Sequence, residues 1–213
     1  MEQNEIHRLY FDLFKKYGSP EQYWPQWCKK EKSLCDREII ALGAILTQRT
    51  SWRNAETALI NLKKAGLLSL EKIAELGSYK PLISLIKAAG FYQTKPKRLF
   101  DFCRFAIKEY GGLRGLLKEN LEEARVKLFS LYGIGPETAD TILLYALDKS
   151  SFVIDEYTRR LVKKEGWGTN LSYEYLKSLF EKSLPVDVKI YQDFHALIIF
   201  SQKEGSVWGM EVV

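Results

Sequence analysis

Apolar residues recur along most of this chain at the three- and four-residue spacing of amphipathic helices. In the segment 37–47, Ile39, Leu42 and Leu46 fall at this spacing and share one side of a helix. No segment alternates apolar and polar residues over six or more positions, and the apolar run 152–154 is too short to found a sheet. The pattern therefore predicts an all-α protein. Further helices are predicted over 55–65, 70–76, 80–89, 97–110, 121–132, 136–147, 157–164, 172–183 and 189–203.

Single glycines separate many of the predicted helices. Gly66, Gly77, Gly90 and Gly133 each follow a predicted helix directly, at the position where glycine commonly ends helices. No low-complexity linker and no repeat of fixed period interrupts the series. We therefore expect a compact helical protein with short connections.

Composition and charge exclude several classes of protein. Three cysteines among 213 residues exclude a disulfide scaffold and a four-cysteine zinc or iron–sulfur site made by this chain alone. The longest apolar runs, such as 39–46, fall well below the roughly 18 residues that span a bilayer. The polar, acidic N-terminus predicts no signal peptide. The net charge of +5 is compatible with a nucleic-acid partner but does not require one.

The segment 131–136, with the sequence LYGIGP, predicts a tight turn between two helices. The glycines on either side of Ile134 let the backbone turn sharply and approach another molecule closely. Pro136 suits the first position of the second helix, whose free N–H groups and dipole favour a phosphate. Taken alone, however, the segment is better explained as a plain connection between helices.

A second informative segment follows at 153–161, with the sequence VIDEYTRRL. Asp155 stands between a short apolar run and the start of a predicted helix. An aspartate in this position commonly caps the helix, which contributes ~1 kcal/mol. The same carboxylate could serve a reaction, and the two roles are compatible.

Together, these segments resemble the endonuclease III superfamily of helix–hairpin–helix DNA glycosylases. The family's hairpin pattern Leu-x-Gly-Ile-Gly-x-x-Thr-Ala begins here at Leu131, and its Val-x-Asp-x-x-x-x-Arg pattern begins at Val153. The segment 42–48 (LGAILTQ) resembles the family's glutamine loop, and 90–99 (GFYQTKPKRL) resembles its glycine–aromatic segment. The four segments occur in the family's order. The resemblance implies an all-α fold of two lobes, with the active site in the cleft between them.

The resemblance also implies lobe boundaries. Residues 34–147 would form a six-helix lobe that ends in the helix–hairpin–helix. Residues 1–33 and 148–213 would form a second helical lobe without an iron–sulfur cluster, because no cysteine follows Asp155. The C-terminal segment would then pack through Trp208 and Met210, and His195 would be an ordinary core histidine.

By resemblance, Asp155 stabilises the sugar cation that forms when a base leaves, and the hairpin binds phosphates of the damaged strand. Cleavage of an N-glycosidic bond builds positive charge on the sugar, which a nearby carboxylate favours. Gln48 would fill the gap left by the flipped base and Phe91 would act as a wedge; otherwise Gln48 ends a helix and Phe91 is buried. The remaining DNA-binding candidates are Gly133, Ile134, Gly135 and Thr138 in the hairpin, and the cations Arg49, Lys95, Lys97 and Arg159, which could instead belong to solvated faces.

Two departures from the family narrow the chemistry. Members that also cut the DNA backbone carry a lysine in the second helix of the hairpin, and that lysine forms an imine with the sugar. Glu137 stands at this position, so we expect hydrolysis without strand cleavage. The missing cysteines are the second departure. In both departures, the chain resembles the cluster-free branch of 3-methyladenine DNA glycosylases of the third type.

Aromatic residues support that branch. It has an aromatic-Trp-Pro segment near the N-terminus, and this chain has Tyr23, Trp24 and Pro25 there. Trp52 follows the glutamine loop, where the branch has an aromatic residue. Aromatic faces suit an alkylated purine because its ring is cationic. Without the resemblance, these residues would be interpreted as core.

The sequence therefore predicts a monofunctional glycosylase of base excision repair that removes alkylated purines such as 3-methyladenine. One alternative is a glycosylase for oxidised or deaminated bases, with or without lyase activity. Another is a non-catalytic helix–hairpin–helix protein that binds DNA. We expect a cytoplasmic, nucleoid-associated monomer whose partner is damaged duplex DNA. We expect no metal or other cofactor except for the monovalent cation that hairpins of this family can hold.

Overall fold

The computed structural model describes residues 2–203, and their regular secondary structure is helical throughout, which confirms the predicted all-α class. In chain order, the α-helices are α1 (Glu2–Tyr17), α2 (Pro25–Cys28), α3 (Leu34–Leu46), α4 (Trp52–Lys64), α5 (Leu70–Ala74), α6 (Leu82–Leu85), α7 (Lys95–Tyr110), α8 (Leu113–Lys118), α9 (Leu121–Phe129), α10 (Pro136–Thr141), α11 (Glu156–Glu165), α12 (Tyr173–Ser183) and α13 (Val188–Ser201). The short 3₁₀ turns η1 (Pro20–Gln22) and η2 (Lys87–Ala89) and the π-helical segment η3 (Ile142–Ala146) complete the series.

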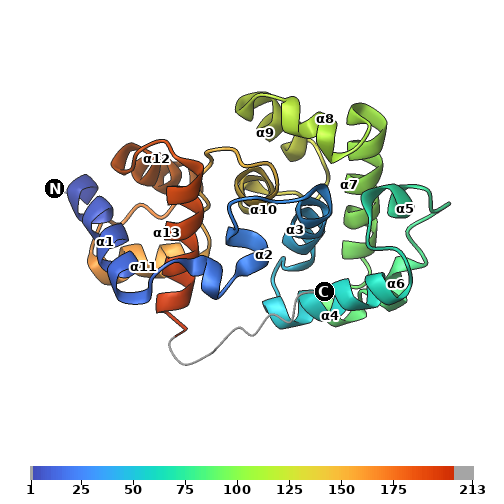
Figure 1. The fold of residues 1–213 in the computed structure, drawn as a ribbon, viewed down its shortest axis with the longest axis horizontal. Helices are drawn as coiled ribbons and strands as arrows, with labels where there is room; N and C mark the ends of the chain where they lie inside the picture. The colour runs from blue at the N-terminus through green and yellow to red at the C-terminus, as the bar shows by residue number, and fades with distance from the viewer. Residues whose placement is uncertain (1, 204–213) are drawn as a thin grey trace.

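The helices form two groups (Figure 1). At one end, α1 packs against α12 and α13, and α11 packs against α13. At the other end, α3 packs against α4, α7 and η3, and α5 packs against α7. The short helix α2 contacts both groups, through α13 on one side and through α3 and η3 on the other. The N-terminal segment therefore bridges the two lobes at the point where their surfaces meet.

The range 34–147 contains more helical segments than the six expected. The structure divides it into eight α-helices together with η2 and η3. The helix at Leu113 was not predicted, because its six residues are too few to show a helical period. The segment predicted as one helix over 80–89 is two short pieces, and a π-helical turn replaces the end of the helix predicted over 136–147.

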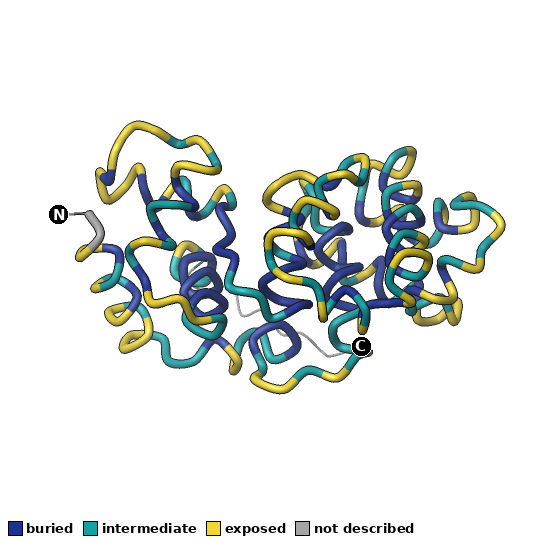
Figure 2. Tube along the Cα trace, turned by 90° about the horizontal axis from the view of Figure 1, so that it is seen from above, coloured by how far each residue is buried: buried dark blue, intermediate teal, exposed yellow. Residues whose placement is uncertain are grey.

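Buried positions run through the centre of each lobe (Figure 2). Helix α3 supplies a large part of the core, with Ile40, Leu42 and Ile45 fully buried. A capping box begins this helix, in which the Ser33 hydroxyl accepts from the Asp36 amide and the Asp36 carboxylate accepts from the Ser33 amide. Since α3 leads directly into the predicted glutamine loop, this buried helix provides a rigid support for that loop.

The second helix of the hairpin is held by a buried carboxylate. Asp140 on α10 is completely buried, and both its oxygens accept from the Arg125 guanidinium, at 2.8 and 3.1 Å. The Ser151 hydroxyl donates to the same carboxylate at 2.7 Å and the Tyr173 hydroxyl at 2.9 Å. Buried charges are tolerated when they are paired and hydrogen-bonded in this way. The network ties α10 to α9 and α12, so the hairpin cannot move independently of its surroundings.

The cysteines are ordinary thiols in the structure. Cys28 and Cys103 are buried and Cys35 is exposed. Burial raises the pKa of the Cys28 thiol to about 12, so it is not a thiolate at neutral pH. Among residues 2–203, none of the helices combines the length and the apolar character needed to cross a bilayer. Trp208 and Met210, expected to pack the C-terminal segment, lie outside the described residues.

Candidate active site

Asp155 caps the N-terminus of α11, and its carboxylate is nearly enclosed. Its Oδ1 accepts from the backbone amide of Thr158 at 2.8 Å and from the hydroxyl of the same residue at 3.0 Å. Its Oδ2 lies 3.5 Å from Nε2 of His195. Burial raises the pKa of Asp155, but His195 and the hydrogen bonds from Thr158 outweigh it and hold that pKa below its ordinary value. Asp155 is therefore an ionised, well-oriented carboxylate at neutral pH.

Asp155 faces a cavity of about 240 Å³ between the two lobes. Three tryptophans contribute an aromatic wall, and hydroxyl-bearing residues between α3 and α4 also line the cavity. The cavity has the mixed apolar and polar lining of a small-ligand site. Its lining consists of Trp24, Trp27, Thr47, Thr50, Ser51, Trp52, Glu137, Thr141, Val153, Asp155, Tyr157, His195, Ile199 and Lys203.

The tryptophan wall is built by close packing of three segments. Trp27 meets Trp52 edge to face, with ring centroids 5.2 Å apart, and Trp24 lies 6.0 Å from Trp27 at an interplanar angle of 30°. A Cβ at Gly43 of α3 would lie 3.3 Å from both Trp27 and Trp52, so the glycine leaves room for this packing. Trp27 was not predicted as a site residue. Its spacing of three residues from Trp24, on one side of a helical turn, was the available signal.

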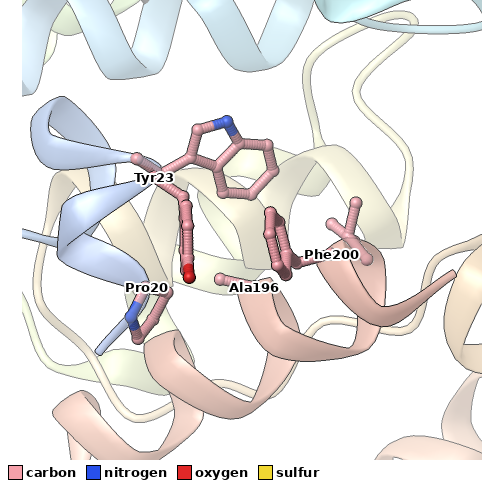
Figure 3. Close-up of a pocket in the computed structure, with 6 residues that line it drawn as sticks. Pro20, Tyr23, Ala196 and Phe200 are labelled. Atoms are coloured by element: carbon pink, nitrogen blue, oxygen red, sulfur yellow. The ribbon is translucent and has the colours of Figure 1, made fainter. Parts of the chain in front are cut away.

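Tyr23 and Pro25 do not line this cavity, which corrects their predicted place in the base pocket. Tyr23 stacks on Phe200 at 4.1 Å, beside Pro20 and Ala196, in a small apolar pocket next to the larger one (Figure 3). Its hydroxyl donates to a backbone carbonyl at 3.1 Å. Pro25 is the first residue of α2, where its fixed φ begins the helix. Both residues thus support the segment that presents Trp24 and Trp27.

Glu137 lies where the cavity meets a second concavity along the hairpin, because it lines both. Partial burial raises the pKa of this carboxyl group, and the nearby Asp155 carboxylate raises it further. The residue at the position of the family's lyase lysine is therefore a second acid beside Asp155. A carboxyl group cannot form an imine with a sugar, so the residue at this position cannot act as the nucleophile of a lyase reaction.

The hairpin is connected to the glutamine loop by direct hydrogen bonds. The Gln48 amide nitrogen donates to the carbonyl of Gly133 at 2.8 Å and to the hydroxyl of Thr138 at 3.0 Å. Its amide oxygen accepts from Arg98 at 2.8 Å. Ile134 is buried, whereas Gly135 is exposed at the start of α10. Thr47, not Gln48, caps the end of α3.

Arg49 and Phe91 line the hairpin concavity, which has a volume of about 430 Å³. Both have left-handed backbones, with φ of 51° at Arg49 and 47° at Phe91. Residues other than glycine rarely adopt this backbone conformation, and backbone strain of this kind is common at functional sites. Phe91 is 52% exposed, so it is not the buried aromatic residue of the alternative interpretation. Two strained residues therefore face the same concavity.

The predicted phosphate-binding cations separate into different environments. Lys95 is completely buried, and its ammonium donates to the carbonyls of Leu46 and Ala89, both at 2.7 Å. Its predicted contact with a phosphate is therefore corrected, because the side chain lies inside the protein. Lys97 is exposed and pairs with Asp101 at 2.6 Å. Arg159 lies over the ring of Tyr173 and donates to a backbone carbonyl at 3.4 Å.

Lys95 instead joins the two loops that carry the strained residues. Leu46 ends α3 directly before the glutamine loop, and Ala89 lies two residues before Phe91. Burial, together with the positive charge of Arg98, lowers the pKa of Lys95 to about 8. One buried ammonium thus holds both loops at a fixed separation.

Substitution Lys95→Met is expected to lower stability by about 2 kcal/mol, because two buried carbonyls lose their donor. The melting temperature should fall by roughly 5 °C. Excision from duplex DNA should fall roughly tenfold or more, since the loops lose their spacing, while excision from single strands should fall less. Lys97→Met on the same helix is the matched control and should melt like the wild type. Equal melting of both variants would contradict the account of Lys95.

The hairpin carbonyls already accept hydrogen bonds within the protein. The amide of Ile134 donates to the carbonyl of Leu131 at 3.0 Å, and Gln48 donates to that of Gly133. A carbonyl oxygen has a second lone pair, so these contacts leave acceptor capacity for the expected monovalent cation. That cation stays a prediction.

Comparisons with known proteins point to one family. Residues 42–186 match the model of the HhH-GPD superfamily base excision DNA repair protein. A putative DNA repair glycosylase of Methanocaldococcus jannaschii is 41% identical over 197 residues, which cover 91% of this chain and 85% of the relative.

Solved structures show the same fold. The crystal structure of H. pylori 3-methyladenine DNA glycosylase bound to 1,N6-ethenoadenine has a TM-score of 0.78 and 29% identity, with 97% of this chain and 100% of the other covered. The structure of a non-covalent complex of endonuclease III with DNA has a TM-score of 0.69 and 16% identity, with 93% and 84% covered. The second similarity concerns the fold alone.

Proposed function

The chain belongs to the HhH-GPD superfamily of base excision DNA repair proteins and is a DNA glycosylase, and from this premise we propose its substrate and mechanism. The proposed substrate is an alkylated purine such as 3-methyladenine in duplex DNA. The proposed reaction is hydrolysis of the N-glycosidic bond, which leaves an abasic site and an intact backbone.

The observation that carries this proposal is the cavity that joins a tryptophan wall to the Asp155 carboxylate. Trp24, Trp27 and Trp52 present an aromatic surface on which a flipped base can stack. An alkylated purine is cationic, and cations are attracted to the faces of aromatic rings. Because its positive charge already weakens the glycosidic bond, the pocket does not have to protonate the leaving base. A tryptophan-lined cavity beside an ionised carboxylate therefore suits this substrate class.

The mechanism follows from the position of Asp155. The C1′–N bond breaks, and its electron pair leaves with the base, so positive charge develops on the deoxyribose. The Asp155 carboxylate stabilises that charge electrostatically. A water molecule then adds to C1′ and gives up a proton, which Asp155 can accept. No step requires an amine, in agreement with the carboxylate of Glu137 at the position of the family's lyase lysine.

The similarity to the H. pylori 3-methyladenine DNA glycosylase supports the proposed substrate, since that protein shares the fold over the whole of its length. A second candidate is a deaminated or oxidised base. It is favoured by the hydroxyl groups of Thr50 and Ser51 in the cavity, because neutral bases are recognised by hydrogen bonds to their edges. Membership of this glycosylase family argues against the non-catalytic alternative.

A panel of lesion duplexes tests the proposal. Each duplex carries one methylated, deaminated or oxidised base and is incubated with the protein, then divided into samples with and without alkali. We expect strand cleavage for methylated purines after alkali treatment only. Cleavage confined to deaminated or oxidised bases would favour the second candidate.

Borohydride trapping tests the absence of lyase chemistry in the same samples. Reduction with borohydride converts an imine between protein and sugar into a permanent adduct. Lys203 also lines the cavity, so the assay tests it as a nucleophile. We expect no covalent adduct with any lesion, and an adduct that disappears in Lys203→Gln would contradict monofunctional hydrolysis.

We further propose that the protein acts as a monomer on damaged duplex DNA inside the cell. The hairpin concavity and the base cavity share Glu137, so one chain presents a continuous surface for one strand. Sedimentation of the protein with an abasic-site duplex should give one chain per duplex.

A further inference from the structure

His195 lies on α13 with its imidazole between the catalytic carboxylate and a buried tyrosine. The residue is 5% exposed and lines the cavity of about 240 Å³ that Asp155 faces. Its Nδ1 is 2.8 Å from the hydroxyl of Tyr145, and its Nε2 is 3.5 Å from Oδ2 of Asp155. Within the described residues, that Nε2 atom is buried without a hydrogen bond of ordinary length. The sequence suggested a satisfied core histidine, but only one of its two nitrogens is satisfied by the core.

The hydroxyl of Tyr145 limits where the hydrogens of His195 can be. This hydroxyl has one hydrogen and lies 3.0 Å from the Gln192 carbonyl as well as 2.8 Å from Nδ1. If Tyr145 donates to Nδ1, the remaining ring hydrogen is on Nε2. If Tyr145 donates to Gln192 instead, Nδ1 donates to the tyrosine oxygen, and a neutral ring would turn a bare lone pair on Nε2 toward the Asp155 carboxylate, which is an unfavourable contact between two acceptors. The first arrangement avoids that contact, and it places a hydrogen on Nε2, facing Asp155.

We propose that His195 is a positioning residue of the reaction centre, which directs its Nε2–H at Asp155 and fixes the orientation of this carboxylate. Thr158 holds Oδ1 from one side, and His195 restrains Oδ2 from the other. Tyr145 in turn orients His195 from the π-helical segment η3, a rare backbone form that often marks functional sites. The proposal rests on the proposed function, because it takes Asp155 as the reacting carboxylate.

Other charged groups around the pair come from three further places. Glu137 on α10 lines the same cavity, and its carboxyl group is acted on by the negative charge of Glu156 and the positive charge of Arg159, both on α11. Lys203 after α13 lines the same cavity. His195 differs from all of these because its ring contacts the carboxylate directly. Its removal should leave burial to dominate, so the pKa of Asp155 should rise.

Two substitutions of His195 separate its polar role from its packing role. His195→Gln keeps an N–H donor, whereas His195→Phe keeps an aromatic ring in a region that already contains Phe152 and Phe194. For His195→Phe, we expect the acid limb of single-turnover excision to move upward by about one pH unit. Excision should then be lost most strongly at acidic pH. His195→Gln should keep most of the wild-type pH profile of excision, because it retains an N–H donor. Tyr145→Phe should shift the acid limb in the same direction. This variant provides the test if His195→Phe fails to fold.

Titration of the Asp155 carboxyl carbon by NMR tests the same inference without substrate. In His195→Phe or Tyr145→Phe, its midpoint should lie about one pH unit above that of the wild type. An unchanged midpoint in both variants, with parallel pH profiles, would overturn the proposal and leave His195 a packing residue. If the midpoint moves but the wild type releases no alkylated purine, the proposed substrate fails while the role of His195 stands.

Discussion

Substitution Asp155→Asn is expected to reduce single-turnover base excision by roughly a thousandfold or more, because the developing sugar cation loses its neutralising charge. The fold should survive, since asparagine caps helices about as well as aspartate. The amide oxygen can still accept from the backbone amide of Thr158, which contacts Oδ1 in the wild type. The measurement is the rate of abasic-site formation with enzyme in excess, together with the melting temperature.

Asp187→Asn is the matched control for this experiment. Asp187 caps α13 by accepting from the amide of Ile190 at 2.8 Å, and it is exposed. The same chemical change outside the cavity should therefore leave both excision and melting near those of the wild type. If Asp155→Asn excised bases within about threefold of the wild-type rate, Asp155 would be a helix cap only, and Glu137 would become the first candidate for the reaction.

The second large effect is expected for Gly133→Ala in the hairpin. Gly133 has a φ of +83°, which an alanine adopts only with strain of ~1–2 kcal/mol. The Cβ of the alanine would also clash with the side chain of Arg98, which donates a hydrogen bond to Gln48. The substitution should therefore separate the hairpin from the glutamine loop and lower affinity for an abasic-site duplex roughly tenfold or more.

Gly135→Ala provides a closely matched control two residues away. The backbone of Gly135 is extended, with φ of −87° and ψ of 177°, and a Cβ there would have no atom within 4 Å. Its melting temperature should equal that of the wild type, whereas that of Gly133→Ala should fall by several degrees. Equal melting temperatures and equal DNA affinities for both variants would show that the contact of Arg98 with the hairpin is not required.

Most of the longer helices and the hairpin could be predicted from local patterns, whereas α1 and α8 were missed. The periodicity over 97–110 and 189–203 corresponds to α7 and α13, with ends shifted by one or two residues. The hairpin was recognisable because the two glycines on either side of Ile134 allow a tight turn and Pro136 favours the start of a helix. The segment 80–89 was less predictable, since its apolar residues fit one helix as well as the two short turns observed.

The candidate site was only partly predictable, because its contacts depend on distant parts of the chain. The role of Lys95 depends on the carbonyl of Leu46, which lies 49 residues earlier. No sequence pattern distinguishes a buried ammonium from one that faces a phosphate. Likewise, the contact of His195 with Asp155 requires α11 and α13 to pack side by side. Side-chain chemistry could be predicted at these positions, but tertiary packing decided their partners.

The most direct test of the central claim is release of free base from methylated duplex DNA, measured by chromatography of the soluble products. We expect the wild type to release 3-methyladenine and leave the strand intact until alkali is added, and Asp155→Asn to release none within the same time. Release of no methylated purine by the wild type, together with removal of a deaminated or oxidised base, would contradict the account.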